Sequence, residues 1–250
     1  MDLYGLIGFP LGHSFSAKFF AEKFSRESID AEYRNFEIED VRKLLQIVDD
    51  YDNLRGLNVT IPHKQAVIPL LDALSDDAKA IGAVNVIRII RGENKTRLEG
   101  HNSDVIGFTE SIRPLLRPHH QKALVLGTGG ASKAVTFGLH KLGIETTYVS
   151  RRASTDRMTY QDVTTDIMQE YTVIVNCSPV GMYPHIDEAP ALPYEALTEN
   201  HLLYDLVYNP LETQFLQRGK ARGATTKNGL DMLHLQALAA WDIWNRKCTK

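Results

Sequence analysis

Apolar and polar residues alternate along residues 56–61, and this two-residue period is typical of a half-buried β-strand. The apolar positions are Leu57, Val59 and Ile61. Asn58 and Thr60 lie between them and are expected to face the opposite side of the strand. The run stops at Pro62, and Lys64 follows two residues later. The pattern therefore predicts an amide, a hydroxyl and an amine close to the end of one strand.

The first half of the chain alternates strand-like and helix-like runs. Strand patterns cover residues 3–8, 32–38 and 56–61, and helical patterns cover residues 16–25 and 41–48. Residues 83–99 have the pattern of two strands around a turn at 91–94, so a hairpin interrupts the alternation. Repeated β-α order predicts a parallel or mixed sheet covered by helices.

A second β-α series follows a predicted helix at residues 105–116, which ends near Pro114–Pro118. Its strand patterns cover residues 122–126, 146–150, 172–178 and 201–208, and a helix is predicted around residues 213–223. The break between the two series predicts a domain boundary. The fold class is therefore α/β, in two domains.

The last predicted helix runs from about Leu230 to Trp244. Its apolar face consists of Leu230, Leu233, Ala237, Trp241 and Trp244. Gln236 lies within the broad apolar arc of this helix, where an unpaired buried amide would cost about 1–3 kcal/mol. From position alone, the pattern favours a backbone partner in the core for Gln236.

Composition and charge favour small-molecule partners. The 250 residues carry a net charge of −3, with acidic and basic residues interspersed, which indicates neither a nucleic-acid site nor an anionic-membrane site. The amino terminus lacks the pattern of a signal peptide, and no segment approaches a membrane span. Cys177 and Cys248 lack the spacing of a disulfide framework or a metal site. We expect a cytoplasmic protein without a metal.

A glycine-rich turn between a predicted strand and a predicted helix, residues 125–132, is the strongest chemical motif. Glycines in this context let the backbone and the helix N-terminus approach a pyrophosphate. The first two glycines of the dinucleotide fingerprint are present, but Ser132 occupies the third position. An ordinary tight turn is the alternative. The predicted cofactor contacts in this turn are Gly127, Thr128, Gly129, Gly130 and Ala131.

The end of the following strand indicates which dinucleotide is bound. About 20 residues after the glycines, an NAD site usually has an acidic residue that binds the ribose 2′-hydroxyl. The residues here are Ser150, Arg151 and Arg152. Two guanidinium groups suit a 2′-phosphate, so the pattern favours NADP. Two solvated arginines at the start of a loop are the alternative.

Eight motifs in order along the chain resemble the shikimate dehydrogenase family over essentially its whole length. The family motif G-x-P-x-x-H-S-x-S-P stands here as Gly8, Pro10, His13, Ser14 and Ser16, with Ala17 in place of the final proline. The others are NVTIPHK, GAVN, NSD with Gly107 behind it, GTGGAS, NCSPVGM, YDLVYNPLETQFL and NGLDMLHLQ.

The resemblance implies a substrate site and a proton-transfer pair. Ser14 and Ser16 would bind the substrate carboxylate, and Lys64 and Asp104 would be catalytic. The residues implied to bind the ring hydroxyls are Asn58, Thr60, Asn85, Asp104 and Gln236. Physical alternatives remain, because the serines and Asp104 could simply cap helices and Lys64 could be a surface lysine.

The resemblance also implies contacts in the second half of the chain. Cys177, Ser178 and Val207 would lie beside the cofactor, with Cys177 as a packed residue and not a nucleophile. Gly229 would let the nicotinamide amide approach, although a simple helix start is the alternative. Tyr208 is a candidate for the substrate pocket, or else a half-buried residue with a hydrated hydroxyl.

The implied architecture is two domains with a cleft between them. Residues 1–103 with 230–250 would form the substrate-binding and catalytic domain, and residues 104–229 the NADP-binding Rossmann domain. The last helix would return to the first domain. As a monomer or homodimer, the protein would reduce 3-dehydroshikimate to shikimate with NADPH, in the chorismate route to aromatic amino acids. A quinate/shikimate dehydrogenase using NAD and a non-catalytic dinucleotide-binding sensor are the alternatives.

Overall fold

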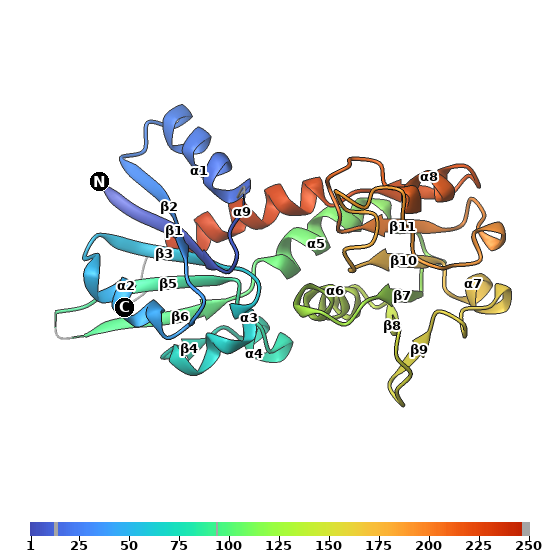
Figure 1. The fold of residues 1–250 in the computed structure, drawn as a ribbon, viewed down its shortest axis with the longest axis horizontal. Coiled ribbons are helices and arrows are strands. Elements are labelled where there is room, and N and C mark those ends of the chain that lie inside the picture. The colour runs from blue at the N-terminus through green and yellow to red at the C-terminus, as the bar shows by residue number, and fades with distance from the viewer. Residues whose placement is uncertain (13–14, 94, 247–250) are drawn as a thin grey trace. The chain divides into compact units, whose positions relative to one another are not determined.

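The computed structural model describes residues 1–12, 15–93 and 95–246, which fold into two α/β units (Figure 1). Unit 1 comprises Met1–Ser103 with Ala237–Lys250, and unit 2 comprises Asp104–Gln236. The chain thus passes from unit 1 to unit 2 after Ser103 and returns within its last helix. The expected division differs from this one at residues 230–236, which lie in unit 2.

Unit 1 is a mixed sheet with helices on both faces. Its strands are β1 (Asp2–Gly8), β2 (Ala31–Glu37), β3 (Leu54–Val59), β4 (Ala73–Leu74), β5 (Val86–Arg91) and β6 (Thr96–His101). Its helices are α1 (Phe15–Arg26), α2 (Lys43–Asp50), α3 (His63–Ala66), the 3₁₀ turn Ile68–Leu70 and α4 (Asp76–Ile81). The strand order is β2-β1-β3-β5-β6-β4. The predicted hairpin is confirmed, because β5 and β6 pair antiparallel.

The two faces of this sheet bury separate cores. Leu57 and Val59 pack on one face with residues of α2. On the other face, Tyr4 and Val86 pack against α1 and against the second half of α9 (Leu230–Trp244). Trp244 is fixed there because its indole nitrogen donates to the Ile87 carbonyl over 3.1 Å. The second half of the last helix therefore packs on the first unit, as predicted.

Strand β3 has the predicted length but lies two residues closer to the amino terminus than its sequence pattern suggests. It ends at Val59, and Ile61, which was expected to face the core, is 74% exposed. The Thr60 amide still donates to Ile7 of β1 over 2.9 Å, and the Ile61 carbonyl accepts from the Phe9 amide over 3.0 Å, before the chain enters α3 at His63. Pro62 has no N–H group to continue the ladder, which accounts for the early end.

Unit 2 is an open sheet whose paired strands all run parallel. Its strands are β7 (Lys122–Leu126), β8 (Glu145–Ser150), β9 (Arg157–Thr159), β10 (Val173–Asn176), β11 (Leu202–Asp205) and β12 (Thr225–Lys227). Its helices are α5 (Asp104–Ile112), α6 (Gly130–Lys141), α7 (Thr165–Glu170), α8 (Gln214–Lys220) and the 3₁₀ turns Arg113–Leu115 and Tyr194–Ala196. Every residue of β10 and β11 is buried, as both faces are covered.

The strand order of unit 2 is β12-β11-β10-β7-β8-β9. Counted along the chain from β7, this is the 3-2-1-4-5-6 order of a doubly wound Rossmann sheet. The order reverses between β7 and β10, which are neighbours in the sheet. In such sheets, ligands bind outside the carboxyl ends of the strands at this switch point.

Candidate functional site

The glycine-rich turn lies at the switch point of unit 2, directly after β7. Gly127 has φ +103°, a left-handed conformation that glycine adopts without strain. Its amide donates to the Val149 carbonyl of β8 over 2.8 Å. A Cβ atom built on Gly129 would meet nothing within 4 Å, so the turn is open at that residue. This backbone fits the approach of a pyrophosphate.

Helix α6 begins at Gly130, with Gly129 as its N-cap residue. The first N–H groups of a helix have no intrahelical partner and carry a partial positive charge. Ser132, at the third fingerprint position, is fully buried, and its hydroxyl donates to the Gly129 carbonyl over 2.7 Å. A serine is accommodated here because its one donor is satisfied within the turn.

The predicted phosphate residues follow the carboxyl end of β8, the strand next to β7. The Ser150 hydroxyl donates to the Arg152 carbonyl over 2.6 Å and accepts from the Arg152 amide over 3.3 Å. Arg151 and Arg152 are both exposed. Their guanidinium groups are thus available to a ligand, although exposure alone also fits solvated arginines.

A buried carboxylate connects the loops that follow β10 and β11. Asp205 is fully buried, and its Oδ1 atom accepts from Asn176 Nδ2 and from the Val207 amide, both over 3.0 Å. Its Oδ2 atom accepts from the Thr213 hydroxyl over 2.6 Å. Asn176 in turn accepts from the Ser178 amide over 3.0 Å and its hydroxyl over 2.7 Å. Burial raises the pKa of Asp205 to about 6.

Cys177 and Gly229 occupy tight positions in these same loops. The Cys177 amide donates to Leu126 of β7, and burial raises the pKa of its thiol, which supports a packed residue and not a nucleophile. The Gly229 amide donates to the Val207 carbonyl over 3.2 Å. A Cβ on Gly229 would overlap the Leu206 carbonyl group, so backbone packing alone requires glycine there.

In unit 1, a tyrosine that sequence reasoning missed lies among predicted substrate residues. The Tyr33 hydroxyl donates to Asn58 Oδ1 over 2.8 Å. Burial raises its pKa, and Ser16, which lies beside it in the first turn of α1, lowers that pKa by less. Asn58 Nδ2 lies 3.4 Å from the Asn85 carbonyl. Ser16, Asn58 and Asn85 therefore belong to one group, whereas Ser14 lies outside the described residues.

A second missed residue, Ser103, fixes the orientation of Asn85. The Asn85 side chain is 3% exposed; it accepts from the Ser103 amide over 2.6 Å and donates to the Ser103 hydroxyl over 3.0 Å. Lys64, half-buried in α3, accepts at its carbonyl from the Val84 amide over 2.8 Å. These bonds place the backbone of Lys64 beside the segment that carries Asn85. Thr60 is also half-buried, directly after β3.

In unit 2, Asp104 and Gln236 lie on two helices that pack closely. Asp104 is 3% exposed in the first turn of α5, where a helix N-terminus favours a negative charge. A Cβ on Gly107 of the same helix would be 2.5 Å from the Met232 carbonyl and 2.9 Å from the Gln236 amide. Gln236 itself is half-buried, and Tyr208 is 39% exposed.

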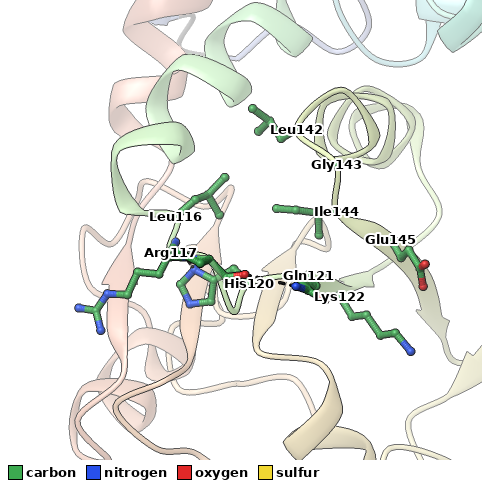
Figure 2. A pocket seen from close by; sticks show the side chains of 10 residues that line it. Leu116, Arg117, His120, Gln121, Lys122, Leu142, Gly143, Ile144 and Glu145 are labelled. Carbon is green, nitrogen blue, oxygen red and sulfur yellow. Dashed lines mark hydrogen bonds between the residues drawn. The ribbon is translucent and has the colours of Figure 1, made fainter.

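A cavity of about 400 Å³ lies at the opposite end of β7 from the glycine turn (Figure 2). Its lining includes the side chains of Leu116, Leu142 and Ile144, and Figure 2 shows Arg117, Lys122 and Glu145 extending away from them. Predicted site residues do not line it, so the glycine turn is the stronger candidate for a cofactor site.

Within the described ranges, no group of three or more His, Cys, Asp and Glu residues could hold a metal ion. Over those same ranges, the structure contains no helix with the length and apolar character needed to cross a membrane. Cys248 lies outside the described residues.

The sheet order of unit 2 and its glycine turn define the class: a Rossmann-type dinucleotide-binding domain joined to a second α/β domain. Residues 6–87 match the family described as the shikimate dehydrogenase substrate binding domain. A shikimate dehydrogenase (NADP(+)) from Desulforamulus reducens is 35% identical, over 96% of this chain and 88% of that protein. The chain belongs to the shikimate dehydrogenase family.

Solved structures of this family have the same fold. Shikimate 5-dehydrogenase from Thermus thermophilus, in complex with NADP(H) and shikimate, has a TM-score of 0.84 at 31% identity. The alignment covers 98% of this chain and 94% of that one. Shikimate 5-dehydrogenase from Listeria monocytogenes, in complex with shikimate and NAD, has a TM-score of 0.86 at 28% identity, covering 98% and 92%.

Proposed function

We propose that the protein catalyses the NADPH-dependent reduction of 3-dehydroshikimate to shikimate in aromatic amino-acid biosynthesis. The main supporting observation is that a glycine turn at the switch point of a Rossmann sheet occurs in a chain whose residues 6–87 match the substrate binding domain of this family. The relatives named as NADP(+) enzymes and the neighbour bound to NADP(H) and shikimate support the same substrate and cofactor.

NADPH, when bound, supplies the hydride that reduces the ketone carbon. As the hydride adds, negative charge develops on the ketone oxygen and a proton must be supplied there. Lys64 is proposed to donate this proton and to accept it in the reverse reaction. Asp104 is proposed as the second member of the proton-transfer pair. The burial of its carboxylate in the first turn of α5 supports a fixed position for the charge.

The substrate domain is proposed to bind the carboxylate and the ring hydroxyls with separate groups. Ser16 in the first turn of α1 suits a carboxylate, because the partial positive charge at a helix N-terminus favours an anion and the hydroxyl can donate to it. Ser14 is proposed for the same role. The residues proposed to bind ring hydroxyls are Asn58, Thr60, Asn85, Asp104 and Gln236, with Tyr208 as a further contact.

The cofactor contacts are proposed along the carboxyl edge of the unit 2 sheet. Ser150, Arg151 and Arg152 are proposed to bind the 2′-phosphate, because two exposed guanidinium groups follow β8 next to the glycine turn. The other proposed contacts are Gly127, Thr128, Gly129, Gly130, Ala131, Cys177, Ser178, Val207 and Gly229. A cytoplasmic location and a monomeric or homodimeric state stay predictions.

The test is oxidation of shikimate and quinate by the purified protein with NADP⁺ and with NAD⁺, followed at the nicotinamide absorbance. We expect turnover with shikimate and NADP⁺. A strong preference for NAD⁺ and quinate would support the alternative dehydrogenase instead. Dinucleotide binding without any turnover would support the non-catalytic sensor.

Substitution of Lys64 tests the proton-transfer role. Lys64→Ala should lower turnover by roughly two orders of magnitude, since general acid catalysis contributes at least that much, and substrate binding should change far less. Lys79→Ala removes an exposed lysine from α4 of the same unit and serves as the control. Similar turnover in both variants would rule out Lys64 as the proton donor.

A further inference from the structure

Tyr33 lies in unit 1 at a position that fixes its ring. It stands on β2 in register with Tyr4 of β1, and β1 separates β2 from β3. The Tyr33 ring stacks on Phe20 of α1, with ring centroids 4.8 Å apart and an interplanar angle of 12°. On the same face of the sheet, the ring centroid of Trp244 in α9 lies 6.5 Å from that of Tyr33. Packing between two aromatic residues leaves the hydroxyl little freedom to move.

The Tyr33 hydroxyl connects residues from two other elements. It donates to Asn58 Oδ1 on β3 over 2.8 Å, and Ser16 on α1 lies beside it. Leu6 of β1 pairs with Asn35 of β2 on one side and with Asn58 of β3 on the other. Asn58 is therefore in register with Asn35, two residues after Tyr33. The tyrosine side chain therefore reaches diagonally across β1. Burial raises its pKa by more than Ser16 lowers it, so the hydroxyl keeps its proton and stays a donor.

This hydrogen bond decides which end of the Asn58 amide a ligand meets. An asparagine side chain offers an oxygen acceptor and an NH₂ group with two donors. The oxygen receives the Tyr33 hydroxyl, and the NH₂ group lies 3.4 Å from the Asn85 carbonyl. Asn58 can therefore present a donor to a ligand, and the ligand atom beside it must accept a hydrogen bond. Without the Tyr33 hydroxyl, the amide could rotate and present its oxygen instead.

We infer that Tyr33 is a positioning residue for substrate, because its hydrogen bond holds Asn58 with its NH₂ group toward the ligand. This inference rests on the proposed function. It adds a specificity-determining group behind the proposed substrate contacts. Tyr33 touches no part of the proposed proton-transfer pair in the contacts that the described residues show, so its effect is expected in substrate affinity.

The experiment is steady-state kinetics of Tyr33→Phe with shikimate and NADP⁺. Phenylalanine keeps the stacked ring and removes the hydroxyl alone. We expect the KM for shikimate to rise roughly tenfold, about the worth of one hydrogen bond, with kcat and the KM for NADP⁺ nearly unchanged. Tyr4→Phe is the matched control, because Tyr4 lies in the same aromatic cluster and should leave all three constants as they are.

A double-mutant comparison shows whether Tyr33 acts through Asn58. Tyr33→Phe added to Asn58→Ala should raise the KM for shikimate much less than it does in the wild type, because residues that act through one another are not additive. The positioning role would be overturned if Tyr33→Phe raised the KM for shikimate as much in the Asn58→Ala protein as in the wild type. A loss of kcat in step with a lowered melting temperature in Tyr33→Phe would also overturn it.

The outcomes separate this inference from the proposed function. Wild-type protein that turns over shikimate, with an unchanged KM in Tyr33→Phe, would overturn the role of Tyr33 and leave the function standing. Wild-type protein without activity on shikimate would overturn both.

Discussion

Asp205 offers a test of how burial controls a titrating group at the edge of the unit 2 sheet. Its carboxylate is fully buried and accepts hydrogen bonds from Asn176, Val207 and Thr213. These bonds favour the ionised form, but burial outweighs them and raises the pKa to about 6 from the ordinary 3.8. Asp205→Asn keeps the shape and one oxygen acceptor while it removes the titration.

The expected size of the effect follows from the two pKa values. A difference of roughly 2 units corresponds to about 3 kcal/mol at 1.36 kcal/mol per unit. Between about pH 4 and pH 6, folded Asp205 holds a proton that the unfolded chain has released. Asp205 therefore contributes stability that is fully present below the unfolded pKa and is lost as the pH rises through about 6.

The assay is urea unfolding of the wild type and Asp205→Asn at several pH values between about 4 and 7. As the pH falls, the unfolding free energy of the wild type should rise relative to that of Asp205→Asn. Carboxylates with lowered pKa values, such as Asp40 beside Arg42, titrate in both proteins and cancel. Asp187→Asn, at an exposed loop position, is the control. A difference that does not change with pH would refute the raised pKa.

Two further predictions concern the cofactor edge of unit 2. Arg151→Ala should weaken NADPH binding roughly tenfold and leave NADH binding nearly unchanged, since only NADPH carries the 2′-phosphate. Fluorescence titration of both nucleotides measures this, with exposed Arg222→Ala as the control, and equal losses would contradict the phosphate role. Gly229→Ala should lower the unfolding free energy by at least about 1–3 kcal/mol, because its methyl group would overlap the Leu206 carbonyl group. Denaturant unfolding without such a loss would show that the loop relaxes.

Long periodic elements could be predicted from the sequence, and several short ones could not. The helix Leu230–Trp244 has the predicted bounds, because its apolar spacing persists over several turns. Strands β9 and β12 have three residues each and α4 and α7 six each, too few for a period to emerge. Helices α4 and α7 are instead marked by their N-caps, Ser75 and Thr164, which accept from the amides of Ala78 and Ile167.

The supporting residues of the candidate site were missed for a different reason. Tyr33 and Asn58 are 25 positions apart, and Asn176 and Asp205 are 29 apart, so no local pattern connects them. Such pairs arise only once parallel strands bring distant segments to one sheet edge. The motif residues were identifiable because their order along the chain resembles a family. The groups that hold them required the fold.

Tyr33 and Asp205 play comparable parts in the two units but should respond differently to pH. Each is a single side chain that connects segments carrying proposed ligand contacts. Burial raises both pKa values, which keeps the Tyr33 phenol neutral across the physiological range but brings the titration of Asp205 close to neutrality. Hydrogen bonds to an ionised acceptor are the stronger kind, so protonating Asp205 weakens its individual bonds to Asn176 and Val207, even though burial makes the protonated form the more stable one in the fold. We therefore expect cofactor affinity to change near pH 6. The contribution of Tyr33 to shikimate affinity should not change in that range.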